Sequence, residues 1–273
     1  MGLLMIDEDK CKKDGICARE CPMAIIKLKD GDPFPRMVQR GEDLCNDCGH
    51  CVAVCPHGAL SHTHVPVEKS PLIEKELEIN EEHSVQFLRS RRSIRFFKEQ
   101  PVEKEKLQRL IEIARYAPTG ANLQLVEWIV FTDPDKIKEI SGLTVEWMRK
   151  AVEKDPQSVP PYLPLVISAW DMGYNSVLWR APALVVASSP AETTTGLVDV
   201  TLALSYLELA APKLGVGTCW AGLVDHALQE SASLKEVIGL PNGYPYHYPM
   251  MVGYPKPKYI RLPERKAPKI TWK

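Results

Sequence analysis

The chain has 273 residues, which is enough for one large domain and one small domain with a real hydrophobic core. Its 34 Lys and Arg residues nearly cancel its 35 Asp and Glu residues, so no broad field is present to hold nucleic acid or an anionic membrane. No stretch approaches the ~20 apolar residues that a membrane-spanning helix requires. The N-terminal apolar run is too short for a signal peptide, so we expect a cytoplasmic location.

The first 60 residues contain two similar units, CKKDGICARECPMAII and CNDCGHCVAVCPHGAL, each closed by Cys-Pro. They hold seven of the eight cysteines. In a reducing compartment such spacing indicates a metal site rather than disulfides. A C-x2-C-x2-C run supplies three ligands to a [4Fe-4S] cluster, and the cysteine before proline ligates the other cluster in two-cluster ferredoxins. Structural zinc fits less well, because zinc ribbons lack the third cysteine in the loop.

The spacing therefore predicts two clusters, each with four ligands. One is predicted on Cys21, Cys45, Cys48 and Cys51, and the other on Cys11, Cys17, Cys55 and Asp14. Asp14 stands where a cysteine belongs, and a carboxylate is a harder ligand that binds iron more labilely. We favour an Asp-ligated [4Fe-4S] cluster under reducing conditions, with a [3Fe-4S] cluster and a free Asp14 as the alternative. Residues 5–62 resemble bacterial-type two-cluster ferredoxins, some of which carry Asp at this corner.

The segment that follows is polar and has no strong apolar period, which is typical of a linker. We expect residues 1–62 to form the two-cluster domain, residues 63–82 the linker and residues 83–273 a second domain.

The second domain shows patterns of both helices and strands. Residues 102–117 place apolar side chains at i, i+3, i+4 and i+7, as an amphipathic helix does. Residues 196–211 are apolar almost all round, which predicts a buried helix that Pro212 kinks or ends. Short β-branched segments predict strands at residues 126–132, 183–189 and 250–254. Because helices outnumber strands and do not strictly alternate with them, we expect an α+β fold. Residues 155–179 have no clear period and are interpreted as a variable excursion or lid.

Three polar or glycine-rich stretches are candidates for ligand binding. SRRSIRFF brings together Arg91, Arg92, Ser93 and Arg95, and guanidinium groups suit a phosphate, although an exposed basic run is more often a solvated face. APTGANLQ presents the amides of Asn122 and Gln124, which can hydrogen-bond ring edges or sugar hydroxyls. LGVGTCWAG has glycines that let the backbone approach a flat ligand. Its Cys219 is interpreted as a small buried residue.

These three stretches in this order, followed by V-G-Y-P and a basic tail, resemble the FMN-dependent nitroreductase family over about residues 84–273. The resemblance implies an α+β fold and a homodimer that exchanges segments and binds FMN at the subunit interface. The residues that it implies for FMN binding are Arg91, Arg92, Ser93, Arg95, Pro118, Thr119, Asn122, Gln124, Trp220, Ala221, Gly222, Arg265 and Lys266. Among them, the arginines and Ser93 would contact the phosphate and ribityl chain, and a backbone N–H from 220–222 would lie near flavin N5. Arg265 or Lys266 would complete the phosphate site.

The simplest members of that family lack a fused two-cluster domain. Its presence in this chain indicates the route by which electrons reach FMN. Two one-electron centres in the same chain can deliver the two electrons that FMN accepts. We expect a low-potential donor such as reduced ferredoxin, a small acceptor such as a nitroaromatic, quinone or activated alkene, and an anaerobic host. The natural substrate and any catalytic side chain cannot be read from the sequence. Alternatives are an FMN dehydrogenase running in reverse, or a non-catalytic electron-transfer subunit of a larger complex.

Overall fold

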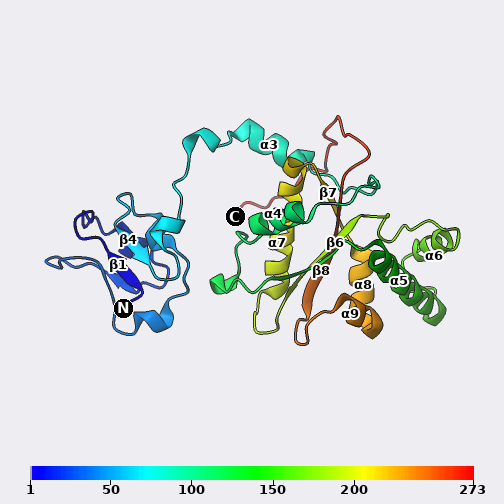
Figure 1. Cartoon of the computed structure of the whole chain (residues 1–273), viewed down its shortest axis with the longest axis horizontal. Helices are drawn as coiled ribbons and strands as arrows, with labels where there is room; N and C mark the ends of the chain where they lie inside the picture. The colour runs from blue at the N-terminus through cyan, green and yellow to red at the C-terminus, as the bar shows by residue number, and fades with distance from the viewer. Residues whose placement is uncertain (1) are drawn as a thin grey trace. The chain divides into compact units, whose positions relative to one another are not determined.

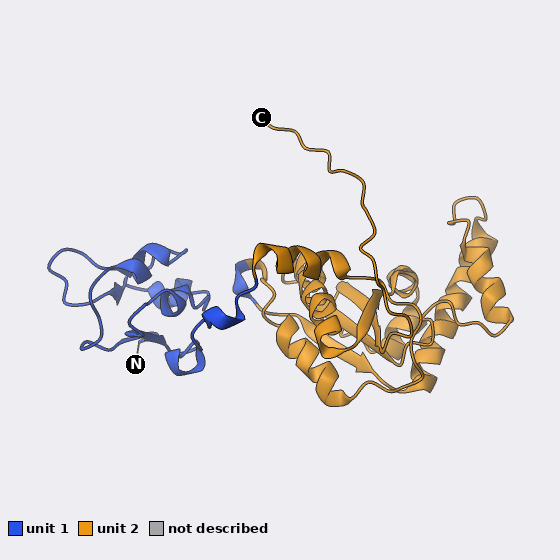
Figure 2. Cartoon of the chain, turned by 90° about the horizontal axis from the view of Figure 1, so that it is seen from above, with its two compact units in different colours: residues 1–79, 121–123 blue, residues 80–120, 124–273 orange. Residues whose placement is uncertain are grey.

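The computed structural model describes residues 2–273, which divide into two compact units (Figure 2). The first unit ends at Ile79 and also includes Ala121–Leu123. The second consists of Asn80–Gly120 and Gln124–Lys273. Each unit has its own core.

The first unit is built from short elements that connect its two cysteine-rich repeats. In chain order these are β1 (Leu4–Ile6), α1 (Ile16–Glu20), β2 (Ile26–Lys27), β3 (Arg36–Met37), α2 (His50–Ala53) and β4 (Leu60–His62). Strands β1 and β4 pair antiparallel, as do β2 and β3. The first and last strands of the unit are therefore hydrogen-bonded to each other.

The two short helices of the first unit begin in the same way. Gly15 precedes α1 with φ +68°, and Gly49 precedes α2 with φ +72°. Glycine adopts this left-handed backbone without the steric cost that a Cβ brings. Each turn leads a buried cysteine, Cys17 or Cys51, into a core that includes Ile26 and Leu60. The internal repeat seen in the sequence is thus a repeat of structure.

The second unit is organised around a four-stranded antiparallel sheet. Its order is β5 (Glu127–Phe131), β6 (Ala183–Ser189), β8 (Tyr246–Gly253) and β7 (Gly217–Trp220). Every residue of β6 is buried. A strand covered on both faces favours a continuous apolar run rather than an alternating one, as the first five residues of ALVVASS provide.

Helices cover both faces of this sheet (Figure 1). The helices of the second unit are α3 (Glu81–Ser90), α4 (Lys104–Ala114), α5 (Pro134–Lys154), α6 (Leu163–Asp171), α7 (Gly196–Ala210), α8 (Gly222–Glu230) and α9 (Ala232–Ile238). Helix α3 has no buried residue, and α6 packs against α5. One core joins α4 and α7 to the β6 face that carries Val185, and the other joins α5, α8 and α9 to the face that carries Leu184 and Val186. The predicted α+β class is confirmed.

Most predicted elements are present with small shifts at their ends. The helix expected at 102–117 is α4, and the strands expected at 126–132 and 183–189 are β5 and β6. The strand expected at 250–254 begins four residues earlier, at Tyr246. Helix α7 ends at Ala210, and Pro212 lies in the short 3-10 turn that follows. The excursion at 155–179 contains an ordered helix, α6.

One expectation about α7 is wrong. The helix was expected to be buried all round, but Leu197 and Val198 are more than half exposed and Tyr206 is 40% exposed. The opposite face, with Val200, Leu204 and Leu207, lies in the core. Apolar residues therefore cover one face of α7 that the chain itself does not bury.

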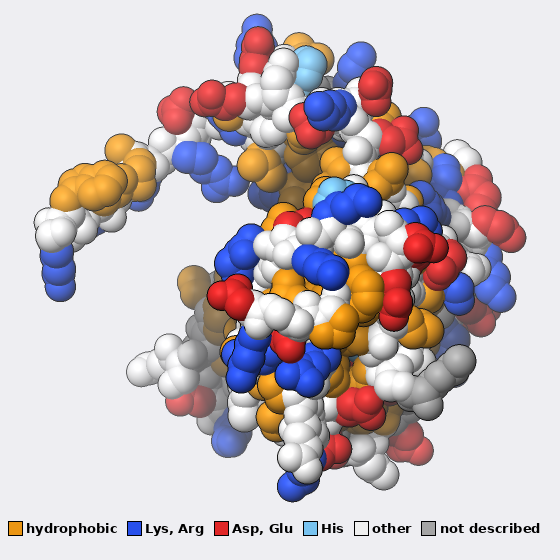
Figure 3. All heavy atoms as spheres, turned by 90° about the vertical axis from the view of Figure 1, so that its left-hand side faces the viewer, with side chains coloured by type: hydrophobic (Ala, Val, Ile, Leu, Met, Phe, Trp, Pro, Cys, Tyr) orange, Lys and Arg blue, Asp and Glu red, His pale blue; other side chains and the backbone are white. Residues whose placement is uncertain are grey.

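No helix within residues 2–273 combines the length and apolar character needed to cross a membrane. Basic and acidic side chains are interspersed over the face drawn in Figure 3. This mixture agrees with the formal net charge of −1.

Candidate functional site

In the first unit, the side chains predicted to hold the first cluster lie close together. Burial raises the pKa of the Cys17 thiol, and the nearby charges of Cys55, Asp14 and Cys11 raise it further. These three neighbours are the partners that the spacing predicts for Cys17. The Cys55 sulfur also accepts a hydrogen bond from the backbone N–H of Ala59 at 3.4 Å.

The side chains predicted for the second cluster form a separate group. Cys21, Cys45, Cys48 and Cys51 line the same small cavity. Burial raises the pKa of the Cys51 thiol to about 11, with further contributions from Cys48, Cys21 and Cys45. A bound cation reverses this tendency, because metal binding deprotonates a coordinating thiol. All seven cysteines of the unit are free thiols, as cluster ligands must be.

Asp14 is held at the start of α1 by two contacts. Its Oδ1 accepts a hydrogen bond from the backbone N–H of Ile16 at 3.1 Å, and its Oδ2 lies 3.3 Å from His57 Nε2. The carboxylate thus lies near Cys17 while 35% of the Asp14 side chain stays exposed. This position is compatible with a ligand at the fourth corner of the first cluster.

The structure also places a histidine, His62, beside the second group of cysteines. Sequence reasoning did not single it out. Its Nε2 lies 3.6 Å from Cys45 Sγ and 3.5 Å from Asp47 Oδ1, and burial lowers the pKa of its ring. Cys45 and His62 are 17 residues apart and belong to no recognised sequence motif. The contact is therefore visible only in the folded unit, where β4 pairs with β1 and places His62 opposite Leu4.

In the second unit, the arginine-serine stretch lies against strand β7. Ser93 and Thr218 form an isolated parallel bridge, and the Ile94 backbone N–H donates to the Thr218 carbonyl at 2.8 Å. Gly217 permits this approach, because a Cβ there would lie 2.4 Å from Ile94 Cγ1. Residues 93–94 and 217–218, which are far apart in sequence, are therefore brought together.

Cys219 lies at the centre of this junction and is 1% exposed, as expected of a small buried residue. Burial raises the pKa of its thiol. The charges of Arg95 and Arg91 and a hydrogen bond with Ser93 oppose that rise, so these side chains lie nearby.

Glu208 of α7 links two predicted site residues, although sequence reasoning missed it. It is 6% exposed. Arg91 Nη1 donates to Glu208 Oε1, and Trp220 Nε1 donates to Glu208 Oε2, both at 3.0 Å. An acid in a mostly apolar helix was the available signal, because a buried carboxylate requires a partner. Trp220 also packs edge-on against Tyr248, with ring centroids 5.0 Å apart.

Ala221 and Gly222 follow Trp220 at the end of β7. The Ala221 backbone N–H donates to the Pro249 carbonyl at 3.0 Å, so it is already engaged. Gly222 begins α8, where the first backbone N–H groups have no partner within the helix. These are the backbone donors available to a ligand that lies beside 220–222.

The stretch 117–124 forms a tight loop after α4. The Gly120 backbone N–H donates to Asp199 Oδ1 at 3.1 Å, and a Cβ at Gly120 would lie 2.1 Å from Thr195 Oγ1. Thr119 Oγ1 accepts a hydrogen bond from the Gln124 backbone N–H at 3.0 Å. Pro118 is exposed.

Three non-glycine residues in this loop, Ala121, Asn122 and Gln124, have φ values between 49° and 58°. Such left-handed conformations are strained for residues with a Cβ and are concentrated at functional sites. Asn122 belongs to the first unit, where its Nδ2 donates to the Asn46 carbonyl at 2.9 Å.

Other predicted residues are not joined to the arginine cluster. Within residues 2–273, no hydrogen bond or ion pair connects Thr119 or Gln124 with residues 91–95. Arg265 and Lys266 lie in the exposed C-terminal tail, where Glu264 forms an ion pair with Arg89 at 3.6 Å.

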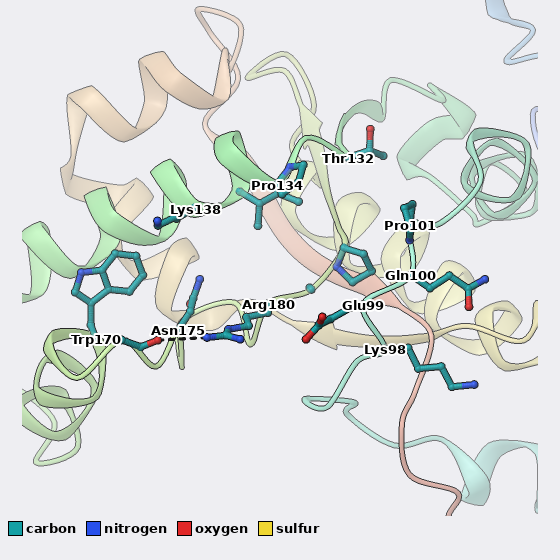
Figure 4. Close-up of a pocket in the computed structure, with 14 residues that line it drawn as sticks. Lys98, Glu99, Gln100, Pro101, Thr132, Pro134, Lys138, Trp170, Asn175 and Arg180 are labelled. Atoms are coloured by element: carbon teal, nitrogen blue, oxygen red, sulfur yellow. Dashed lines mark hydrogen bonds between the residues drawn. The ribbon is translucent and has the colours of Figure 1, made fainter.

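A separate cavity of 730 Å³ lies beside the start of α5 (Figure 4). Trp170, Asn175 and Arg180 form one side of it, and Arg180 Nη2 donates to the Gly173 carbonyl at 3.5 Å. Lys98 and Glu99 line it from the segment after the arginine cluster. None of the residues predicted to bind FMN lines this cavity.

A family model described as Nitroreductase family matches residues 88–254, which is more than half of the chain. The chain belongs to the nitroreductase family. A second model, described as a 4Fe-4S dicluster domain, matches residues 9–60. This nitroreductase-family chain therefore carries an N-terminal iron-sulfur domain of the ferredoxin-like type, as the sequence predicts.

Individual relatives agree with this assignment. The solved structure of a nitroreductase with bound FMN from Bacteroides fragilis is 19% identical, with a TM-score of 0.56, and the alignment covers 71% of this chain and 98% of that one. The FMN reductase [NAD(P)H] of Bacillus subtilis is 28% identical over 66% of this chain and 68% of its own length. Iodotyrosine deiodinase 1 of Rattus norvegicus is 36% identical over 87 residues, which are 31% of this chain and 28% of that protein.

Arg92 in the second unit of this nitroreductase-family chain offers donors that fit an anionic cofactor. Arg92 Nη1 donates to the Arg91 carbonyl at 2.5 Å, but its Nε and Nη2 are buried and have no partner among the described residues. Buried guanidinium donors without an acceptor are costly and rare. A phosphate would supply the missing acceptors, so the residues present fit FMN. Family membership and these relatives support an FMN-dependent oxidoreductase.

Proposed function

We propose that the chain is an iron-sulfur flavoprotein that passes electrons from a low-potential donor, such as reduced ferredoxin, to a small acceptor. Nitroaromatics, quinones and activated alkenes are the acceptor classes. The observation that carries the proposal is the presence of a dicluster domain and a nitroreductase-family unit in one chain. Two one-electron centres in the same chain as a two-electron cofactor could deliver both electrons that the cofactor accepts.

The first unit would hold two clusters on its two groups of ligands. The cavity shared by Cys21, Cys45, Cys48 and Cys51 supports the second of these. The neighbours of Cys17 support the first, with Asp14 as its fourth ligand. Residues 1–62 would make up this domain, residues 63–82 the linker and residues 83–273 the flavin domain.

The second unit would hold FMN against strand β7. Arg92 would donate to the phosphate from its two unpartnered nitrogens, with Arg95 and Ser93 beside it. Arg91 would be oriented by Glu208. When bound, FMN supplies two-electron transfer chemistry. The backbone at Trp220–Gly222 would face the ring, and Arg265 or Lys266 would complete the phosphate site.

The assembly would be a homodimer with FMN at the subunit interface. The exposed apolar face of α7 supports this arrangement, because Leu197, Val198 and Tyr206 would be covered by a second copy. Pro118, Thr119, Asn122 and Gln124 would reach the flavin of the partner subunit. The lack of a hydrogen bond or ion pair between residues 91–95 and Thr119 or Gln124 among the described residues is compatible with this arrangement.

Anaerobic purification, followed by quantification of iron, sulfide and flavin, tests the proposal. About eight irons and one FMN per chain are expected, with an EPR signal that appears on reduction by dithionite. About seven irons with a [3Fe-4S] signal in the oxidised protein would mean that Asp14 is not a ligand. Absence of flavin would overturn the reductase assignment.

A second measurement tests the direction of the electrons. Reduced ferredoxin should bleach the flavin absorbance, and a nitroaromatic or enone should restore it. Rapid bleaching of the flavin absorbance by NADH in the absence of ferredoxin would contradict the proposal that electrons must reach FMN through the clusters. Reoxidation that occurs only with another protein would instead favour an electron-transfer subunit, and electron release from a reduced substrate into the clusters would favour the reverse direction.

A further inference from the structure

His62 is the last residue of β4 and lies beside the group of cysteines predicted to hold the second cluster. It is 2% exposed. Strand β4 pairs with β1 so that His62 lies opposite Leu4, and the histidine lines the same small cavity as Cys21 and Cys45. A polar ring enclosed in this way needs a partner for each of its nitrogens.

One ring nitrogen has a partner that determines the tautomer. The backbone N–H of His64 donates to His62 Nδ1 at 3.1 Å. Nδ1 is therefore an acceptor, which leaves the proton of the neutral ring on Nε2. Because the donor is a backbone group, substitution of the His64 side chain would not remove it.

Two acceptors lie near His62 Nε2. Cys45 Sγ is at 3.6 Å and Asp47 Oδ1 is at 3.5 Å. A distance of 3.5 Å is long for an N–H···O hydrogen bond, whose usual range ends near 3.2 Å. Sulfur is a larger atom, so its hydrogen bonds are longer. Asp47 also has another donor, because its Oδ2 lies 2.8 Å from His64 Nδ1.

This side-chain donor distinguishes the two groups of ligands. Backbone N–H groups lie near sulfurs in both groups. Ala59 donates to Cys55 at 3.4 Å, and the backbone N–H of Val52 lowers the pKa of the Cys51 thiol. Among the hydrogen bonds of the described residues, His62 alone offers a side-chain N–H to a predicted ligand sulfur. The local field at Cys45 can therefore be changed by substitution without altering the backbone.

We infer that His62 tunes the reduction potential of the cluster on Cys21, Cys45, Cys48 and Cys51 by donating its Nε2–H to the Cys45 sulfur. The inference rests on the proposed function, because it requires the clusters to be present. Hydrogen bonds to the sulfurs are among the factors that set the potential of such clusters. The donor stabilises the reduced cluster, which carries one more negative charge, and the proton stays on Nε2 while one electron enters.

The test is an EPR-monitored redox titration of the anaerobic full-length chain. In His62→Leu, the ratio of reduced to oxidised second cluster at a fixed potential should fall about tenfold, equivalent to a shift of about 59 mV for one electron. The first cluster should titrate as before. His62→Gln keeps an N–H at a similar reach and should recover most of the shift. His83→Leu, at an exposed histidine of the second unit, is the control.

The outcomes separate this inference from the proposed function. Absence of clusters from the unaltered chain would contradict both the proposed function and the role of His62. Two clusters in His62→Leu with unchanged potentials would overturn the role of His62 alone. If that variant incorporates too little iron, His62→Phe, which has a ring without an N–H, gives the same comparison. An equal shift in His62→Gln and His62→Leu would also contradict a hydrogen bond.

Discussion

Arg91 Nη1 and Glu208 Oε1 lie 3.0 Å apart and join the arginine-serine stretch to α7 across 117 positions of sequence. Glu208 uses its second oxygen to accept from Trp220. Its side chain is 8% exposed and that of Arg91 is 28% exposed, so the pair is largely shielded from water. One buried carboxylate thus orients two residues that we assign to the FMN site.

Glu208→Gln should weaken FMN binding and destabilise the second unit. The amide can serve only one of the two donors well, and removal of one partner leaves the other partly buried charge uncompensated. The expected loss is ~1–3 kcal/mol, which corresponds to roughly a 5- to 150-fold higher dissociation constant if it falls on binding. Fluorescence titration of apoprotein with FMN measures it. Glu105→Gln, at an exposed residue of α4, is the control, and equal affinities in both variants would contradict the orienting role.

Arg92→Ala should lower the affinity for FMN far more than the affinity for riboflavin, which lacks the phosphate. A hydrogen bond to a charged group contributes ~1.5–3 kcal/mol, so a roughly 10- to 150-fold loss for FMN is expected. The two ligands are compared by calorimetry on the same apoprotein. Arg109→Ala changes an exposed arginine of α4 and should affect neither. Equal losses for both ligands would place Arg92 away from the phosphate.

Asp14→Cys should convert the first cluster site into one with four cysteine ligands. Thiolate is the softer ligand, so the cluster should keep its fourth iron after brief exposure to air better than the unaltered chain does. Asp14→Ala should give a [3Fe-4S] signal and about seven irons. Iron analysis and EPR of the oxidised proteins check both. Identical iron contents in all three proteins would exclude Asp14 from ligation.

Val198→Lys should dissociate the proposed homodimer. Val198 is 57% exposed on the apolar face of α7, and a buried ammonium group at an interface is costly without a partner. Sedimentation velocity at micromolar concentration should show monomer. Leu165→Lys, on α6, changes a residue that is 70% exposed and should leave the dimer intact. A dimeric Val198→Lys variant would place the interface elsewhere.

Local patterns predicted the elements whose partners lie within the chain. The stripe through Leu107, Leu110 and Ala114 predicted α4, and the apolar run of residues 183–189 predicted β6, because each pattern reflects burial in the core of one unit. The fold class followed from the same patterns. The 21-residue helix α5 was not predicted, since two polar residues, Ser141 and Thr144, lie on its buried face and interrupt its apolar period.

The error at α7 has a physical cause. An apolar face looks the same in sequence whether it packs against its own sheet, as Leu204 does, or stays exposed, as Val198 does. An apolar face in the sequence predicts that the face is kept from water, but it does not identify the surface that covers it.

Site residues were easiest to predict where spacing is fixed by chemistry. The ligand groups around Cys17 and Cys51 follow from a loop that must converge on one cluster. Glu208 and His62 act through contacts made by sheet pairing and helix packing, and neither has a fixed offset from the residues that it touches. Such contacts can be recognised only in the folded structure.

The reactivity of the Cys219 thiol can show whether the second unit is folded. Its thiol is 1% exposed and burial raises its pKa, so it is a poor nucleophile while the unit stays folded. Alkylation of this position, identified by mass spectrometry, would follow the opening of the flavin domain without regard to iron content. The other seven cysteines would follow the loss of the clusters. A single labelling experiment with two sets of peptides could therefore show whether the two halves of the chain fail together or separately.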